Sequence, residues 1–202
     1  MTEITWMKGF IPQIVNDPTF IPFNIKSVLD VGCGKGILGA ILRNYRTVNR
    51  LVGIDVFEPC IEHARRHYDE VLCIDIAGQR LPFDDDTFDF IGCLSTIEHF
   101  SHDDALTLLQ EMTRIGKHVL VTTPTYFMPQ GVLDDNPYQV HMCSVSKKDF
   151  ESLGYRVRGT GKFRMPYLGI SLPIQSWMLG SLIPSWHTSY LSVWPSEGRT
   201  YE

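Results

Sequence analysis

The sequence has no cluster of basic residues, no internal repeat and no low-complexity segment. Its 202 residues carry 18 Lys and Arg against 23 Asp and Glu, a net charge of -5, and the basic residues are scattered along the chain. A protein that grips a nucleic-acid backbone needs a basic face. DNA and RNA are therefore disfavoured as partners, and the length predicts one domain with an ordinary hydrophobic core.

Closely spaced cysteine pairs are also missing, since the chain contains no C-x-x-C motif. The cysteines are odd in number and far apart, which argues against a disulfide framework. The first residues lack the basic-then-apolar pattern of a secretion signal. We expect reduced thiols and a cytoplasmic location; the five cysteines are Cys33, Cys60, Cys73, Cys93 and Cys143.

Charged side chains disappear altogether over residues 165–196, a stretch that holds three Trp and four Pro. The prolines and polar residues divide it into pieces too short to span a bilayer. The pattern predicts a helix near Leu172–Leu182 and a last strand over Ser189–Trp194, paired with the strand before it. Two interpretations stay open: a hairpin insertion with ordinary packing, or a roof over an apolar substrate that makes peripheral membrane contact through 165–196.

What the sequence does have is a strand, a glycine-rich turn and a helix in direct succession. An apolar run over Ser27–Val31 is followed by glycines at alternate positions, and an apolar-periodic segment then begins at Ile37. Glycine adopts positive φ at little cost and lets a ligand approach the backbone. A ligand is expected there, at the carboxyl end of the first strand of an α/β sheet. The glycines are Gly32, Gly34, Gly36 and Gly39.

The spacing of these glycines fits two different cofactors. Gly34-x-Gly36-x-x-Gly39 satisfies the dinucleotide fingerprint, which is weak evidence when it stands alone. The overlapping set that begins at Gly32 follows Asp30, an acid that suits the ammonium group of a methionine moiety better than a pyrophosphate. The glycine turn alone does not decide between them.

Two further acids lie at the ends of predicted strands. Asp55 ends the run Arg50–Asp55 about twenty residues beyond the glycines, where a carboxylate can bind ribose hydroxyls, although it could also cap the next helix. Asp75 and Ile76 follow a third strand, where the acid can accept from an adenine amino group while Ile76 packs on the ring. Dinucleotide enzymes do not usually need a carboxylate at that third position.

With these motifs, the chain resembles the class I S-adenosyl-L-methionine-dependent methyltransferase superfamily, in particular the small-molecule enzymes of ubiquinone and menaquinone biosynthesis. The resemblance runs from Ser27 to Thr123. It implies a Rossmann-like, doubly wound α/β fold with a seven-stranded, mostly parallel sheet and an antiparallel terminal hairpin. One domain over 1–202 is expected, with a cap (1–24), a cofactor-binding core (25–123) and a substrate-side part (124–202) that holds the loop, strand six, the insertion and strand seven.

The resemblance also implies roles for individual residues. Gly32 and Gly34 would line the methionine end of the cofactor, with Asp30 near its amino group. Asp55 would hold the ribose beside Val56, and Asp75 and Ile76 would meet the adenine. The segment around Leu94 would pass close to the sulfonium. The implied cofactor-binding residues are Asp30, Gly32, Cys33, Gly34, Asp55, Val56, Asp75, Ile76 and Leu94.

The acceptor is less well defined by the sequence. The Asn/Asp-Pro-Pro-aromatic motif of many amino-directed methyltransferases is absent, which favours transfer to oxygen or carbon of a small, apolar or lipid- or glycan-linked metabolite. Neutral histidine is the default base near pH 7, so His99 and His141 are the candidate catalytic residues. His141 has an equally good alternative role, tying down the long loop 124–145.

Other interpretations remain open at this stage. His63 and His67 have chelating spacing but are flanked by two arginines, and no metal site is expected. The chain could instead be an NAD(P)-dependent oxidoreductase, or a cofactor-binding subunit that is inactive without a partner.

Overall fold

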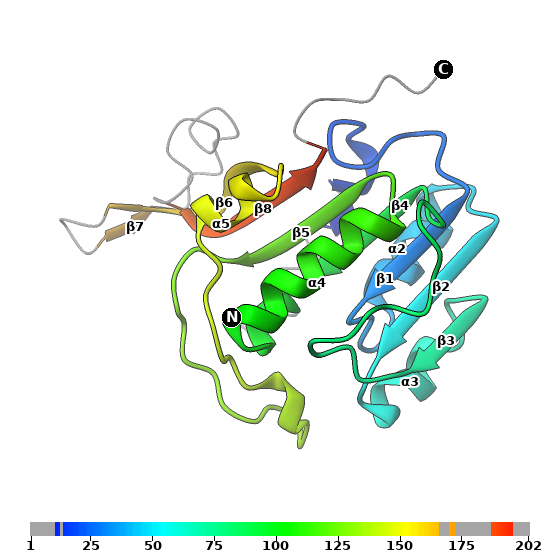
Figure 1. The fold of residues 1–202 in the computed structure, drawn as a ribbon, viewed down its shortest axis with the longest axis horizontal. Helices are drawn as coiled ribbons and strands as arrows, with labels where there is room; N and C mark the ends of the chain where they lie inside the picture. Colours follow the sequence, from blue (N-terminus) through cyan, green and yellow to red (C-terminus); the bar gives the residue numbers. More distant parts are fainter. Residues whose placement is uncertain (1–10, 13, 166–169, 173–186, 196–202) are drawn as a thin grey trace.

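The computed structural model describes residues 11–12, 14–165, 170–172 and 187–195, and they form one mixed sheet with helices on both faces (Figure 1). The strand order is β3-β2-β1-β4-β5-β8-β6-β7. The strands are β1 Ser27–Val31, β2 Arg50–Asp55, β3 Glu70–Cys73, β4 Phe90–Leu94, β5 Val119–Pro124, β6 Arg156–Met165, β7 Ile170–Leu172 and β8 His187–Trp194. The α-helices are α2 Ile37–Tyr45, α3 Glu58–Ala64, α4 His102–Ile115 and α5 Lys147–Ser152, with 3-10 turns η1 Ile97–His99 and η2 Pro137–Gln139.

The central strand β1 lies where the winding of the sheet reverses. It pairs in parallel with β2 on one side and with β4 on the other, and β3 and β5 extend the parallel part outward. Strand β8 then runs antiparallel to both β5 and β6. In an open α/β sheet of this kind, ligands bind outside the carboxyl ends of the strands at the reversal point. The end of β1 is therefore where a site is expected.

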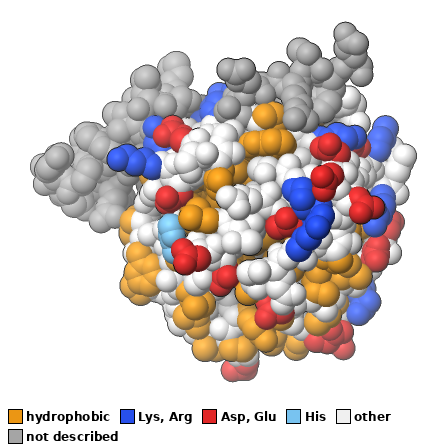
Figure 2. Space-filling model, in the orientation of Figure 1, with side chains coloured by type: hydrophobic (Ala, Val, Ile, Leu, Met, Phe, Trp, Pro, Cys, Tyr) orange, Lys and Arg blue, Asp and Glu red, His pale blue; other side chains and the backbone are white. Residues whose placement is uncertain are grey.

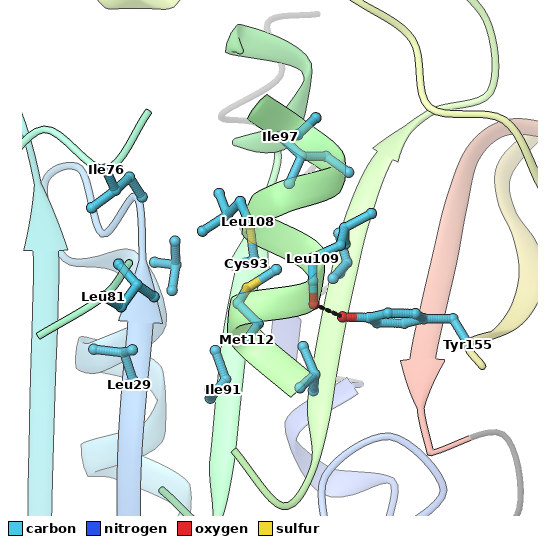
Figure 3. Packing of buried hydrophobic residues seen from close by; sticks show 14 of the residues in the cluster. Leu29, Ile76, Leu81, Ile91, Cys93, Ile97, Leu108, Leu109, Met112 and Tyr155 are labelled. Atoms are coloured by element: carbon cyan, nitrogen blue, oxygen red, sulfur yellow. Dashed lines mark hydrogen bonds between the residues drawn. The ribbon is translucent and has the colours of Figure 1, made fainter. Parts of the chain in front are cut away.

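Each face of the sheet buries its own apolar core, because successive strand residues point to opposite faces. Leu29 and Val31 of β1 pack with α4 and α5, whereas Val28 packs with α2, α3 and residues of the N-terminal segment. Figure 1 shows α4 in front of the sheet and α2 behind it. Figure 3 shows Leu108 and Met112 of α4 lying over Ile91 and Cys93 of β4. Both faces are covered, as the near-continuous apolar strands predict.

The expected fold class is confirmed, and the hairpin formed by β6 and β8 is antiparallel as predicted. A short eighth strand, β7, is added at the outer edge of β6. The bounds predicted from the sequence for α2, Ile37–Tyr45, and for β2, Arg50–Asp55, are those observed. The sequence also predicts Ser101 and Ser146 as N-caps, and each accepts a backbone N–H group of the helix that follows it, α4 and α5 respectively. The sequence predicts the next helix near Glu58–Tyr68, but α3 ends at Ala64, so His67 lies beyond it.

Some expectations fall mostly outside the described residues. The helix expected near 172–182 does so apart from Leu172, which is in β7, and so does most of the uncharged stretch 165–196. Within the expected cap, the sequence predicts a short helix near 5–15. Residues 11, 12 and 14–16 are described and helical, with Ile14 and Val15 in the core behind the sheet. Within the described part of the chain, no helix is long and apolar enough to cross a membrane.

The surface drawn in Figure 2 mixes charges of both signs. Basic side chains lie beside acidic ones on this face, and no continuous basic area is visible among its described residues. Arg114, for example, contacts both Asp85 at 2.7 Å and Glu111 at 2.7 Å. The arrangement is the one expected from scattered basic residues in the sequence.

A buried tyrosine hydroxyl ties β6 to the helix in front of the sheet. Tyr155, which precedes β6, is 2% exposed and donates to the carbonyl of Leu109 in α4 at 3.1 Å (Figure 3). Tyr155→Phe should lower the free energy of unfolding by about 1 kcal/mol, because the carbonyl loses a buried donor. Urea titration of both proteins measures the difference. Equal midpoints would show that the hydrogen bond contributes nothing net.

Candidate functional site

The turn after β1 is held in place by the end of the neighbouring strand. The backbone N–H groups of Gly32 and Cys33 both donate to the carbonyl of Ile54 in β2, at 2.9 and 3.0 Å. Gly32 and Gly34 have φ of +71° and +51°, the left-handed region in which only glycine is free of strain. A Cβ on Gly34 would meet no atom within 4 Å, so the turn faces open space at that position.

Asp55 is oriented by two backbone donors at the end of β2. Its Oδ2 accepts from the N–H of Gly34 at 2.8 Å, and its Oδ1 accepts from the N–H of Phe57 at 2.9 Å. A carboxylate has about four lone-pair positions, so both oxygens keep the capacity to accept from a ligand. Phe57 is the N-cap residue of α3, so by accepting its N–H group Asp55 also fulfils part of the alternative role as a helix cap.

A cavity of about 280 Å³, here called the strand-end cavity, opens over the ends of β2, β3 and β4. Asp55 and Val56 line it from β2 and the residue after, and Asp75 and Ile76 line it from the segment after β3. Asp75 is exposed, with Oδ1 accepting from the N–H of Ala77 at 3.0 Å, whereas Ile76 is buried. A flat ring with polar edges would meet an apolar surface and two carboxylates there.

A larger cavity of about 460 Å³, here called the glycine-turn cavity, adjoins it on the side of α2. Its wall includes Asp30, Cys33 and Leu94, while Gly32 and Gly34 line both cavities. Ile11 of the N-terminal segment also lines it. All nine residues expected to bind the cofactor thus line two adjoining cavities.

Asp30 is buried beside the turn and is hydrogen-bonded to the Tyr68 hydroxyl. The Tyr68 hydroxyl donates to Oδ2 of Asp30 and accepts from the backbone N–H of Gly39 at 3.0 Å. Burial raises the pKa of Asp30 to about 7, an effect opposed by the Tyr68 hydrogen bond and reinforced by the charge of Asp55. A cation that enters the glycine-turn cavity would favour the ionised form of Asp30.

Tyr68 also explains the third glycine of the dinucleotide fingerprint. A Cβ on Gly39 would lie 2.5 Å from Cζ of Tyr68, so this glycine is required by packing against the tyrosine ring. The same ring packs near Gly36 and Gly53. Because close helix packing requires a glycine here in any fold of this kind, Gly39 does not distinguish a dinucleotide site from a methyl-donor site.

The two histidines expected to be catalytic are brought together by the fold. Their ring centroids lie 4.9 Å apart, with His99 on η1 and His141 on the loop after β5. His99 lines the strand-end cavity, and burial lowers its pKa, which favours the neutral form that accepts protons. His141 is 5% exposed and its Nδ1 lies 2.7 Å from the carbonyl of Met128. Through Nδ1, His141 therefore has the contact expected of a histidine that anchors the loop.

The long loop 124–145 closes over both cavities. In Figure 1 it runs from the end of β5 toward the carboxyl ends of β1 and β2. Asn136 and Gln139 line both cavities, and Ser95, after β4, does so with a φ of +52°. The segment around Leu94, which the sequence places close to the sulfonium, includes Ser95, whereas Asn136 and Gln139 are not assigned to the site by any sequence motif. The only signal for these two residues is the length of the loop, because no motif identifies which of its residues turn inward.

The other histidine and the cysteines considered as reactive groups have structural roles or are unreactive. The sequence places His118 on the fifth predicted strand and favours a structural role for it over a catalytic one. In the structure its Nε2 lies 2.8 Å from the carbonyl oxygen of Phe20. Burial raises the pKa of the Cys33 thiol well above its usual range, so this cysteine is not a nucleophile near neutral pH. All five cysteines are free thiols.

Comparison with known proteins agrees with this geometry. A family model described as "Methyltransferase domain" matches residues 28–118. The mitochondrial ubiquinone biosynthesis O-methyltransferase of Saccharomyces cerevisiae is 28% identical over 75% of this chain and 54% of its own length. The chain thus spans about half the length of this relative.

Solved structures share the fold at low identity. A SAM-dependent methyltransferase from Archaeoglobus fulgidus superposes with a TM-score of 0.64 at 16% identity, covering 94% of this chain and 92% of its own. The magnesium protoporphyrin IX methyltransferase from Synechocystis, solved with bound SAM, has a TM-score of 0.57 at 14% identity and covers 94% and 77%. Over residues 28–118 the chain is thus similar to methyltransferase domains, and its fold is that of solved S-adenosylmethionine-dependent methyltransferases.

Proposed function

We propose that this chain binds S-adenosylmethionine across the two cavities and transfers its methyl group to oxygen or carbon of a small, apolar or lipid- or glycan-linked acceptor. The observation that carries the proposal is the set of acids at successive strand ends. Asp30, Asp55 and Asp75 stand at the ends of β1, β2 and just beyond β3, around a turn that is open at Gly34. A sulfonium cofactor is cationic, and three carboxylates complement it.

The residues present fit the parts of that cofactor. The two oxygens of Asp55, fixed by backbone donors, would accept from vicinal ribose hydroxyls. Ile76 would pack against the adenine ring, with Asp75 at its amino edge. Asp30 would face the methionine ammonium from the glycine-turn cavity. A pyrophosphate would meet these same carboxylates unfavourably, which counts against an NAD(P)-dependent oxidoreductase.

In this reaction the protein aligns the acceptor atom with the methyl group, excludes water and removes a proton from the acceptor. S-adenosylmethionine supplies a methyl group already activated by its positively charged sulfur. The acceptor oxygen or carbon uses an electron pair to form the new bond while the pair of the broken C–S bond stays on sulfur. Alignment in a closed cavity contributes several kcal/mol. The pair His99 and His141, beside the strand-end cavity, is assigned to ionising the acceptor.

The proposal includes the organisation of the chain. Residues 1–24 form a cap, 25–123 hold the cofactor and 124–202 receive the acceptor, all within one domain. Ile11 at the glycine-turn cavity and Asn136 over both cavities support the first and last of these roles. Five free thiols support a cytosolic setting, where disulfides are rare.

Calorimetry with S-adenosylmethionine tests the proposal directly. Asp55→Asn should weaken binding roughly ten- to hundredfold, because hydrogen bonds to a charged acceptor contribute about 1.5–3 kcal/mol. Asp103→Asn is the matched control, since that side chain is fully exposed on α4. Equal affinities of the two variants, or binding of NADH in place of the sulfonium compound, would refute the assignment.

A further inference from the structure

Three metal-ligand side chains meet beside the strand-end cavity, although they are far apart in the sequence. Glu98 and His99 are adjacent on η1, and His141 comes from the loop after β5. One ligand atom from each lies within 4.8 Å of the other two. The distance along the chain between η1 and His141 explains why spacing alone predicted no metal site.

Each of the three side chains is held by a further group. Nδ1 of His141 lies 2.7 Å from the carbonyl of Met128, and Nδ1 of His99 lies 3.2 Å from the carbonyl of Val140. Thr123 donates its hydroxyl proton to Oε2 of Glu98 at 3.0 Å. Such contacts are typical of metal sites, where a ligating histidine donates its other ring N–H to a carbonyl and is thereby fixed in tautomer and orientation.

The buried nitrogen of His141 points to a ligand. With the proton of His141 on Nδ1, Nε2 carries a lone pair, and this atom is buried with no hydrogen-bond partner in the described part of the chain. The residue is 5% exposed. A buried polar atom without a partner is costly and calls for an explanation such as a bound ion. Two imidazoles and one carboxylate also give the net charge of -1 that complements a divalent cation.

We propose that Glu98, His99 and His141 bind one divalent transition-metal ion at the edge of the strand-end cavity. Two histidines and one carboxylate are a donor set of zinc and non-haem iron sites, and three protein ligands leave positions open for a further ligand. His99 lines the cavity, so an open position would face it.

The role of this ion rests on the proposed function, whereas its binding does not. A metal-bound hydroxyl ionises much more readily than a free one. A hydroxyl of the acceptor that reached the ion would release its proton to solvent near neutral pH and attack as an alkoxide or phenolate. The histidine pair would then ionise the acceptor through the cation, without itself taking the proton.

The test measures metal binding on the full chain in the absence of any cofactor. Chelator-treated protein is titrated with Co²⁺, whose visible absorption reports coordination, and then with Zn²⁺ in competition. One ion per chain should bind, and His141→Ala and His99→Ala should each weaken binding about 100-fold or more. His102→Ala is the control, because this half-exposed histidine lies only three residues from His99 along the chain.

Two outcomes would overturn the proposal. One is the absence of saturable Co²⁺ or Zn²⁺ binding by the wild-type chain. The other is equal Co²⁺ affinity of the wild type and of His141→Gln, a variant that replaces the ligand with a neutral polar side chain if His141→Ala does not fold. Calorimetry of the chelated protein with S-adenosylmethionine reports separately on the proposed function, so failure of one does not imply failure of the other.

Discussion

Asp30→Asn should make the ligand-free protein more stable at pH 8 while it weakens the binding of S-adenosylmethionine. The wild-type carboxyl group is 3% exposed, and burial raises its pKa from 3.8 to about 7. Ionising it in the folded chain therefore costs up to about 4 kcal/mol relative to the unfolded chain. Asparagine avoids this cost, has nearly the same shape and can still accept from the Tyr68 hydroxyl.

The difference in stability between the wild type and Asp30→Asn should depend on pH. Between about pH 4 and pH 7 the folded chain holds a proton on Asp30 that the unfolded chain has lost. Wild-type stability therefore falls through this window as pH rises, and the full cost remains above it. The free energy of unfolding of Asp30→Asn relative to that of the wild type should increase by about 2.5 kcal/mol from pH 5 to pH 8. Urea titrations of both proteins at the two pH values measure it, and parallel curves would contradict it.

Cofactor binding should respond in the opposite direction. A cationic ligand favours ionised Asp30, so wild-type affinity should increase from pH 6 to pH 8, whereas the affinity of Asp30→Asn should change less. At pH 8 the variant should bind roughly ten- to hundredfold more weakly, as expected for loss of one charge at a partly desolvated site. A variant that is both more stable and unimpaired in binding would show that Asp30 is only a packing residue.

Much of this fold follows from local patterns in the sequence. The bounds of α2 and β2 are predicted because glycines and an apolar run mark them sharply, and Ser101 and Ser146 identify the starts of α4 and α5. Helix α3 was predicted too long, because the segment after Ala64 still looks helical although the chain there turns toward β3. The added strand β7 has only three residues, too few for a periodic signal.

Some residues of the site can also be predicted from the sequence, and others cannot. Residues at strand ends are predictable, because parallel strands carry their last residues to one edge of the sheet. The approach of His141 to Glu98 is not, because it depends on the path of a long loop. That path is set by contacts invisible in the sequence: Met142 and Cys143 donate their N–H groups to the carbonyl of Glu98, at 2.8 and 3.3 Å. Asn136 over the cavities is another consequence of the same path.

Gly32→Ala should destabilise the protein strongly, whereas Gly34→Ala should mainly abolish cofactor binding. Both glycines have positive φ, so both variants carry the backbone cost of about 1–2 kcal/mol. Only Gly32 is also crowded, because its Cβ would lie 2.4 Å from Cγ2 and Oγ1 of Thr96. Overpacking of this kind adds about 1–3 kcal/mol. Urea titration should therefore show Gly32→Ala to be the less stable of the two by that amount.

The Thr96 side chain provides the internal control for this difference. Thr96→Ala removes the two atoms nearest to the new methyl group, so the double variant should recover part of the stability lost in Gly32→Ala, a coupling that the double-mutant cycle measures. No such recovery is expected for Gly34→Ala, whose methyl group projects into open space between the cavities. That variant should fold normally and bind S-adenosylmethionine at least tenfold more weakly, since the methyl group occupies the position that a ligand needs close to the backbone. Full binding by Gly34→Ala would mean that the cofactor does not approach the turn at all, and the assignment of both cavities would have to be abandoned.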